Sequence, residues 1–177
     1  MNRTFFIPEP FRVPDGTLVS PFLNANDSQS DLPFDLLSGF SLFAGIIEPM
    51  SSSKLHVMFF VTQVTFVRSG RLSTKMKGPQ DADAYQLHLA EGQSVLTEPG
   101  ALLQLINDTN DPCEALCIAT PPYVFEMDGE GKVLYDDSVV LDNTGYELAQ
   151  SNWRPSVSMP TLAQRETSAY HIAQGKV

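Results

Sequence analysis

Three histidines, His56, His88 and His171, are the residues of this chain best suited to acid–base chemistry or metal binding. An imidazole titrates near neutrality, so it can accept or donate a proton at physiological pH, and it is a common metal ligand. His88 alternates with Leu87 and Leu89. If both leucines face the interior, strand geometry places His88 on the outside. His171 falls in a segment expected to form a helix.

Two cysteines, Cys113 and Cys117, are separated by three residues in a segment that reads as a strand. Four residues of extended chain span roughly 13 Å, whereas the Cα atoms of a disulfide lie within about 7 Å. We therefore expect two reduced, structural thiols and no cysteine metal cluster.

Composition and charge restrict the class of protein. The chain has 177 residues, is 42% hydrophobic and carries a formal net charge of −10, which fits one acidic globular domain. Such a charge opposes binding to nucleic acid or to anionic membranes. The apolar run 5–7 is too short for a signal peptide, and no stretch approaches the ~18 apolar residues of a membrane span. We expect a cytoplasmic protein.

The elements that must position these residues divide the chain into three parts. Residues 1–39 are rich in Pro, Asp, Asn and Ser and are interpreted as an N-terminal arm that wraps the domain or a partner subunit, so a homodimer is expected. Residues 40–142 alternate short β-prone runs with turn signals, a pattern typical of an all-β sandwich or barrel. The predicted strands cover 41–47, 57–67, 71–76, 85–89, 95–96, 102–106, 115–119, 123–127 and 132–135.

Residues 143–177 are predicted to form a linker and a short helix that packs on the barrel. Thr161 and Gln164 have the spacing of a capping box directly after Pro160, and Gly175 is suited to end the helix. The residues near one helical face are Leu162, Ala169, Ile172 and Ala173.

A first motif surrounds His56. Pro49 precedes His56-Val57-Met58, Gln63 follows Met58 by five residues, and Gly70 follows Gln63 by seven. The order of residue types in this motif is a turn, a histidine, a second side chain two positions later, a polar residue and a closing glycine.

A second motif begins at Gly92 and leads through a short strand to Pro99-Gly100, then Leu103 and Asn107. With the first motif, it resembles the paired motifs of the cupin superfamily over roughly residues 40–127. The resemblance implies an antiparallel cupin (jelly-roll) β-barrel, here with an extended N-terminal arm and a short C-terminal helix.

In cupins the two motifs supply four metal ligands, and the resemblance maps these to His56, Met58, Gln63 and Leu103. Only His56 is retained. A thioether, a neutral amide and a leucine are poor substitutes for the nitrogen and carboxylate donors that iron, manganese or zinc requires. We therefore predict no metal and no other cofactor, unless His88 or His171 rebuilds the site.

Without a metal, the resemblance places an apolar pocket in the barrel, lined by Met58, Leu103 and Leu105 beside the polar residues His56 and Gln63. Thr65 shares the face of Gln63. His56 is the candidate catalytic acid or base, with Tyr123, or alternatively Tyr85, as a proton-transfer partner. The competing interpretation is a filled core in which these polar groups only bond to one another or to backbone.

Several function classes remain open. The first is a metal-independent barrel that binds a small, largely apolar organic molecule, either without chemistry or as an isomerase, lyase or cyclase that uses His56. The second is a non-catalytic structural or sensing dimer module. The third is a metal-dependent dioxygenase with an atypical ligand set. Fold alone does not choose among them.

Overall fold

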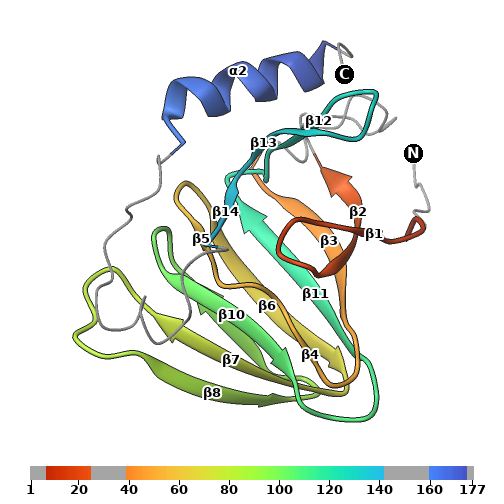
Figure 1. The fold of residues 1–177 in the computed structure, drawn as a ribbon, viewed down its shortest axis with the longest axis vertical. Coiled ribbons are helices and arrows are strands. Elements are labelled where there is room, and N and C mark those ends of the chain that lie inside the picture. Colours follow the sequence, from red (N-terminus) through yellow and green to blue (C-terminus); the bar gives the residue numbers. More distant parts are fainter. Residues whose placement is uncertain (1–6, 25–38, 142–159, 175–177) are drawn as a thin grey trace.

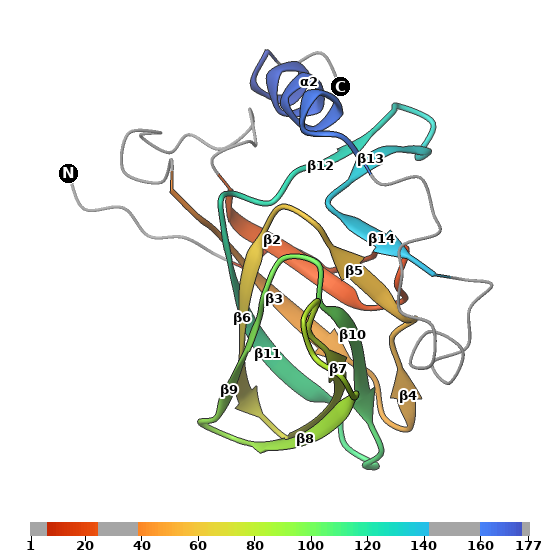
Figure 2. The ribbon, with the colours of Figure 1, turned by 90° about the vertical axis from the view of Figure 1, so that its left-hand side faces the viewer.

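A computed structural model describes residues 7–24, 39–141 and 160–174. These residues form two facing antiparallel sheets, a separate hairpin and one helix (Figures 1 and 2). The first sheet has the order β1 (Phe11–Arg12), β2 (Leu18–Asn24), β3 (Ser41–Ile47), β11 (Cys113–Thr120), β6 (Thr62–Ser69) and β9 (Ser94–Thr97). The second has the order β14 (Ser138–Val140), β5 (His56–Met58), β10 (Leu102–Asn107), β7 (Arg71–Lys77) and β8 (Tyr85–Ala90), and β4 (Ser51–Ser52) also pairs with β10.

The predicted all-β antiparallel barrel is therefore confirmed. Every strand pair within the two sheets is antiparallel. The hairpin of β12 (Phe125–Met127) and β13 (Val133–Asp136) follows β11 and leads the chain into β14 at the edge of the second sheet.

The hydrophobic core lies between the two sheets. It draws on alternate residues of the central strands, which is the consequence of a two-residue side-chain period. The most deeply buried members, each at most 1% exposed, are Val61, Val67, Leu72, Met76, Leu103, Cys113 and Ala119. Both cysteines are buried and unpaired. Burial of these apolar side chains is the main contribution to the stability of the barrel.

The two cupin-like motifs keep the residues that shape turns and loops. Gly70 has φ +85°, and a Cβ atom there would lie 2.9 Å from the Pro112 carbonyl oxygen, so no other residue fits without strain. Asn107 is buried, and its amide nitrogen donates to the carbonyl oxygens of Ile47 and Asp111. Its side-chain oxygen accepts from Thr109. These motif residues serve the fold and do not require a ligand.

The chain differs from the predicted strands in several places, since β4 and β14 were not predicted, and two further differences affect the barrel. The run 57–67 is two strands, β5 and β6, which belong to opposite sheets, because residues 59–61 carry the chain across. The predicted arm also contributes to the barrel, since residues 11–24 contain β1 and β2 and β2 pairs with β3. Pro21 concealed β2 from the sequence pattern; it lies where the register of β2 on β3 shifts, a position that tolerates proline. Residues 1–6 and 25–38 of the arm lie outside the described residues.

Helix α2 (Leu162–Ala173) begins as the sequence predicted. The Thr161 hydroxyl accepts from the Gln164 backbone N–H at 3.2 Å, and the Gln164 side chain accepts from the Thr161 N–H at 2.8 Å. The predicted apolar face is only partly used, since Leu162 is 55% exposed. The predicted linker over 143–159 and the predicted stop at Gly175 lie outside the described residues.

Polar contacts attach α2 to the end of the barrel that carries β12 and β13 (Figure 1). Arg165 forms an ion pair with Asp137, in which Nε lies 2.9 Å from Oδ1, and it also donates to the Pro122 carbonyl oxygen. His171 Nδ1 lies 3.1 Å from Glu126 Oε1 on β12. Within the described ranges, no helix has the length and apolar character needed to cross a bilayer.

Candidate functional site

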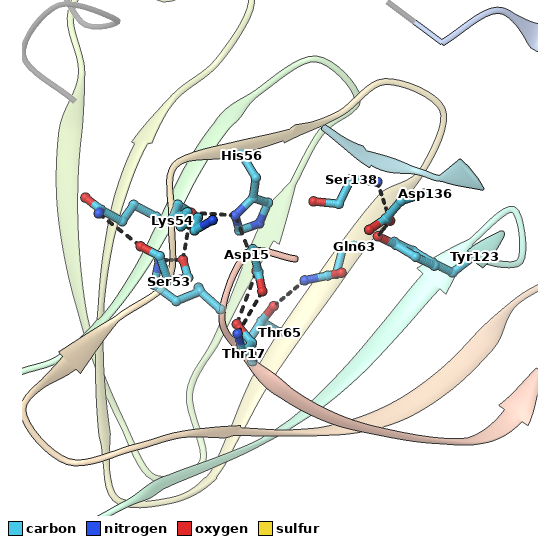
Figure 3. A network of polar contacts seen from close by, with 12 residues as sticks. Asp15, Thr17, Ser53, Lys54, His56, Gln63, Thr65, Tyr123, Asp136 and Ser138 are labelled. Carbon is cyan, nitrogen blue, oxygen red and sulfur yellow. Dashed lines mark hydrogen bonds and ion pairs between the residues drawn. The ribbon is translucent and has the colours of Figure 1, made fainter. Parts of the chain in front are cut away.

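A cavity of about 220 Å³ lies inside the barrel between the first sheet, β5 and the β13–β14 corner. Its walls are mostly apolar, and Ile172 of α2 is one of the lining residues. For scale, an apolar cavity of about 150 Å³ is large enough to bind benzene. The polar lining residues are Asp15, Thr17, Ser41, His56, Gln63, Thr65, Tyr123, Asp136 and Ser138; Figure 3 shows most of them.

His56 is held at the start of β5 by two acceptors. The side chain is 4% exposed, and Nδ1 lies 2.9 Å from the Lys54 carbonyl oxygen and 3.5 Å from Asp15 Oδ2. A carbonyl oxygen can only accept, so Nδ1 carries a proton, and Nε2 is the nitrogen available to exchange a proton with a ligand. Asp15 is itself fixed, because the N–H and hydroxyl of Thr17 donate to its two carboxylate oxygens at 2.8 and 3.1 Å.

Gln63 and Thr65 alternate along β6 and both face the cavity. Gln63 Nε2 donates to Thr65 Oγ1 at 3.0 Å, which fixes the amide and leaves its oxygen as an acceptor. Cys117 lies behind this pair, with Sγ 3.8 Å from the same hydroxyl oxygen. Burial raises the pKa of Cys117 to about 12, so this thiol is inert at neutral pH.

Tyr123 and Asp136 form a second polar cluster. The Tyr123 hydroxyl donates to Asp136 Oδ1 at 2.5 Å, and the Ser138 N–H donates to the same oxygen at 2.8 Å. Burial raises the pKa of Asp136 to about 7, against the lowering effect of these two hydrogen bonds, and the charge of Asp15 adds to the rise. Burial and the neighbouring Asp136 also hold the pKa of Tyr123 well above its usual value.

The cavity brings together six of the seven residues that the sequence placed in the site. His56 and the predicted ligand-binding residues Met58, Gln63, Thr65, Leu105 and Tyr123 all line it. Leu103 does not, because it is fully buried in the hydrophobic core with Met76. The cavity is thus open beside His56 and filled around Leu103. A role for these residues in binding stays a prediction.

The other candidates lie elsewhere. His88 is on the exposed face of the edge strand β8, with Nδ1 2.8 Å from Ser73 Oγ. Leu87 shares the face of the buried Leu89 and pairs with the buried Thr74, although it is itself 38% exposed on this edge strand, and Tyr85 is exposed on the same strand. His171 contacts Glu126 on the outside of β12 and does not line the cavity.

Sequence reasoning missed Asp15 and Asp136. Asp15 lies between Pro14 and Gly16, a pattern that indicates a turn and gives no indication of a site residue. Its segment belongs to the predicted N-terminal arm. Asp136 ends β13 and lies one residue beyond the predicted strand 132–135, so the sequence pattern assigned it to no element. The two consecutive acids Asp136 and Asp137 directly after a predicted strand are the available sequence signal for a site. Carboxylates are rarely buried unless they are paired, so acids next to a barrel strand indicate specific partners.

Comparisons with known proteins were made by sequence and by structure. No family model and no curated protein sequence matches the chain. The Drosophila melanogaster CENP-C cupin domain superposes with a TM-score of 0.50 at 13% identity, covering 62% of this chain and 68% of that domain. Lactobacillus farciminis oxalate decarboxylase, in its formate complex, gives 0.56 at 13% identity, covering 76% of this chain and 34% of the enzyme. The chain has the cupin fold.

A recombinant oxalate oxidase in complex with glycolate gives a TM-score of 0.50 at 17% identity, with 60% of this chain and 52% of the oxidase covered. The match therefore spans about a third of the decarboxylase and half of the oxidase. At sequence identities this low, the similarity to cupin structures establishes the fold of this chain and does not establish an activity.

The residues at the cupin metal positions do not fit a metal ion. His56 directs Nδ1 at backbone, Met58 offers only a thioether, Gln63 is bonded to Thr65, and Leu103 is enclosed in the core. Iron, manganese and zinc sites use several imidazole, carboxylate or thiolate donors. Across residues 7–24, 39–141 and 160–174, no three His, Cys, Asp or Glu side chains form a metal-binding group.

Proposed function

We propose that this cupin barrel binds a small, largely apolar organic molecule without the help of a metal ion. The observation that carries the proposal is the cavity itself, which is mostly apolar and leaves space beside His56 and Asp136. A filled core would have enclosed these polar groups in apolar side chains. A concave apolar site with a few convergent polar groups is the usual form of a ligand pocket.

The polar groups support acid–base chemistry on the bound molecule, as in an isomerase, lyase or cyclase. His56 keeps a lone pair on Nε2, and Asp15 stabilises the imidazolium that forms when this nitrogen accepts a proton. Asp136 titrates near neutrality, which suits it to return a proton to the ligand. Tyr123 orients Asp136 through its hydroxyl, so the tyrosine has a positioning role.

Binding is tested with neutral apolar probes, toluene and 3-phenylpropan-1-ol, by protein-observed NMR. We expect shifts of residues that line the cavity. Ala115→Leu places additional atoms in the cavity and should weaken binding at least tenfold, because Ala115 is a buried lining residue. Ile118→Leu on the same strand is the matched control, since Ile118 is 38% exposed and does not line the cavity. Ala115→Val is the milder alternative where the leucine variant does not fold.

Equal binding by wild type and Ala115→Leu would show that the probes bind elsewhere, and the proposal would then be wrong. Chemistry is tested separately with 4-phenylbutan-2-one, an apolar ketone whose α-hydrogens exchange in D₂O. We expect faster exchange with the protein present, lost in His56→Gln and kept in His88→Gln. Binding of the ketone without accelerated exchange would leave a binding or sensing barrel and refute the catalytic part.

A further inference from the structure

The polar side of the cavity offers several hydrogen-bond acceptors. His56 uses Nδ1 on the Lys54 carbonyl oxygen, which leaves the lone pair of Nε2. Gln63 uses its amide nitrogen on Thr65, which leaves Oε1. The Nδ1–H of His56 and one N–H of Gln63 are therefore used within the protein, while Nε2 and Oε1 face no donor from these two bonds. A ligand that supplies hydrogen-bond donors is suited to this wall.

Asp136 adds an anionic acceptor to the same wall. Both hydrogen bonds that described residues make to this carboxyl group go to Oδ1, from Tyr123 and Ser138, so Oδ2 receives none from them. The Ser138 hydroxyl also lies beside the cavity, buried and without a hydrogen-bond partner among the described residues. A buried hydroxyl of this kind next to an open space indicates that a bound group completes the site.

The charge of the lining has one sign. Asp15 and Asp136 are its two carboxylates, and none of the described lining residues is Lys or Arg. The nearby Arg165 is committed to Asp137 and Pro122, on the other side of the β13–β14 corner. The net charge of −10 adds a field that favours cations over anions. A carboxylate ligand, as in the oxalate-handling structural neighbours, would meet repulsion here.

The remaining walls fit a ring with a short chain. Phe43 and Tyr123 meet edge to face with centroids 6.0 Å apart, and Phe11 and Phe125 meet at 5.9 Å, and all four line the cavity. Aromatic faces bind apolar rings and also favour a neighbouring cation. The volume of about 220 Å³ leaves room beyond one benzene ring.

From these features we propose that the ligand of this barrel is an organic amine. Its protonated nitrogen is held by Asp136, Gln63 and His56 near Asp15, and its apolar body packs among the aromatic rings. An ammonium group carries three N–H donors, which match the acceptors Asp136 Oδ2, Gln63 Oε1 and His56 Nε2. This inference rests on the proposed binding function and specifies the chemical class of the molecule bound.

Three probes with the same apolar body and different head groups test the inference: 3-phenylpropan-1-amine, 3-phenylpropan-1-ol and 3-phenylpropanoate. Affinities are measured by isothermal titration calorimetry at pH 7.5. We expect the amine to bind at least tenfold more tightly than the alcohol, and the carboxylate not to bind. Asp136→Asn should weaken the amine about tenfold and weaken the alcohol by a much smaller factor, because only the amine loses an ion pair. Asp15→Asn serves as the second variant where Asp136→Asn does not fold.

Asp108→Asn is the matched control, because it removes the same charge from an exposed residue outside the cavity, and it should change none of the three affinities. If the alcohol binds as tightly as the amine, or the carboxylate binds, the amine inference is overturned while the barrel still binds apolar molecules. If none of the three probes binds, the proposed function fails together with the inference.

Discussion

Asp136 and Asp137 are neighbours at the end of β13, yet they occupy two very different environments. Asp137 is fully buried and accepts from the Val124 N–H, the Tyr135 hydroxyl, and Nε and Nη2 of Arg165. Asp136 lines the cavity, and the described residues give it two hydrogen bonds and no cation. Consecutive residues of an extended chain point to opposite sides, which produces this division.

The difference shows how one chemical group serves structure in one place and recognition in another. The ion pair at Asp137 has its hydrogen bonds completed by the protein, so it attaches α2 to the barrel and has no capacity for a ligand. The carboxyl of Asp136 is desolvated without a compensating charge, which raises its pKa to about 7. Such incompletely satisfied groups beside a cavity are the ones suited to bind or react.

The largest expected effect comes from breaking the Asp137 ion pair. Arg165→Ala leaves a fully buried carboxylate without its cation, and removal of one partner of such a pair costs about 3 kcal/mol or more. For a chain of this size this corresponds to a fall in Tm of roughly 10 °C. Thermal unfolding monitored by circular dichroism measures the change.

Arg165→Lys is the control for this experiment, since it keeps the charge and loses the two-pronged geometry, and it should fall between wild type and Arg165→Ala. A change in Tm of less than 1 °C in Arg165→Ala would contradict a structural role for the ion pair between Arg165 and Asp137.

We expect the titration of Asp136 to have an intermediate effect on the free energy of unfolding. A folded-state pKa near 7 lies above the usual carboxyl value of 3.8, so the folded protein holds a proton there that the unfolded chain has lost. The contribution of Asp136 is therefore fully present below about pH 4 and is lost as pH rises through 7. Asp136→Asn mimics the protonated form, and at pH 8 it should raise the free energy of unfolding by about 1 kcal/mol or more.

Urea unfolding of wild type and variant between pH 4 and 8 tests this expectation. The difference between the two curves isolates Asp136 from the other groups that titrate in this range. A difference that does not change with pH would show that Asp136 stays ionised throughout, and the comparison with Asp137 would lose its electrostatic basis.

The smallest effect is expected for the Ser138 hydroxyl. It is buried without a partner, so Ser138→Ala should change the free energy of unfolding by less than about 0.5 kcal/mol. Ser41 is the matched control, because its hydroxyl accepts from the Tyr123 N–H at 2.9 Å and Ser41→Ala leaves that buried donor unpaired at a cost of about 1–3 kcal/mol. Equal losses in the two variants would mean that Ser138 has a structural partner.

The elements of the fold were largely predictable because their signals are local. Alternation of apolar residues located most central strands, and the Thr161 capping box located α2. The apolar run through Phe59 and Phe60 led to the wrong prediction of one strand over 57–67. No Gly or Pro marks the crossing between the sheets, and a two-residue period continues across it.

The candidate site was predictable only in part. His56 and Gln63 belong to a spaced motif, whereas Asp15 and Asp136 acquire a role only through the three-dimensional contact of distant segments. Their immediate sequence indicates turns, and a turn residue is ordinarily exposed. Tertiary structure overrides that local signal, because the turn that contains Asp15 is placed against β5 by the pairing of β2 with β3.

The cavity is built from both ends of the described chain: Asp15 and Asp136 are 121 positions apart, and Ile172 lies further still. Contacts so distant in sequence carry a large loop-closure entropy and form late. The central strands β6, β7, β10 and β11 enclose the apolar core without them. We therefore expect the barrel to become compact during folding before its binding site is complete, so that the two carboxylates are desolvated together at a late stage.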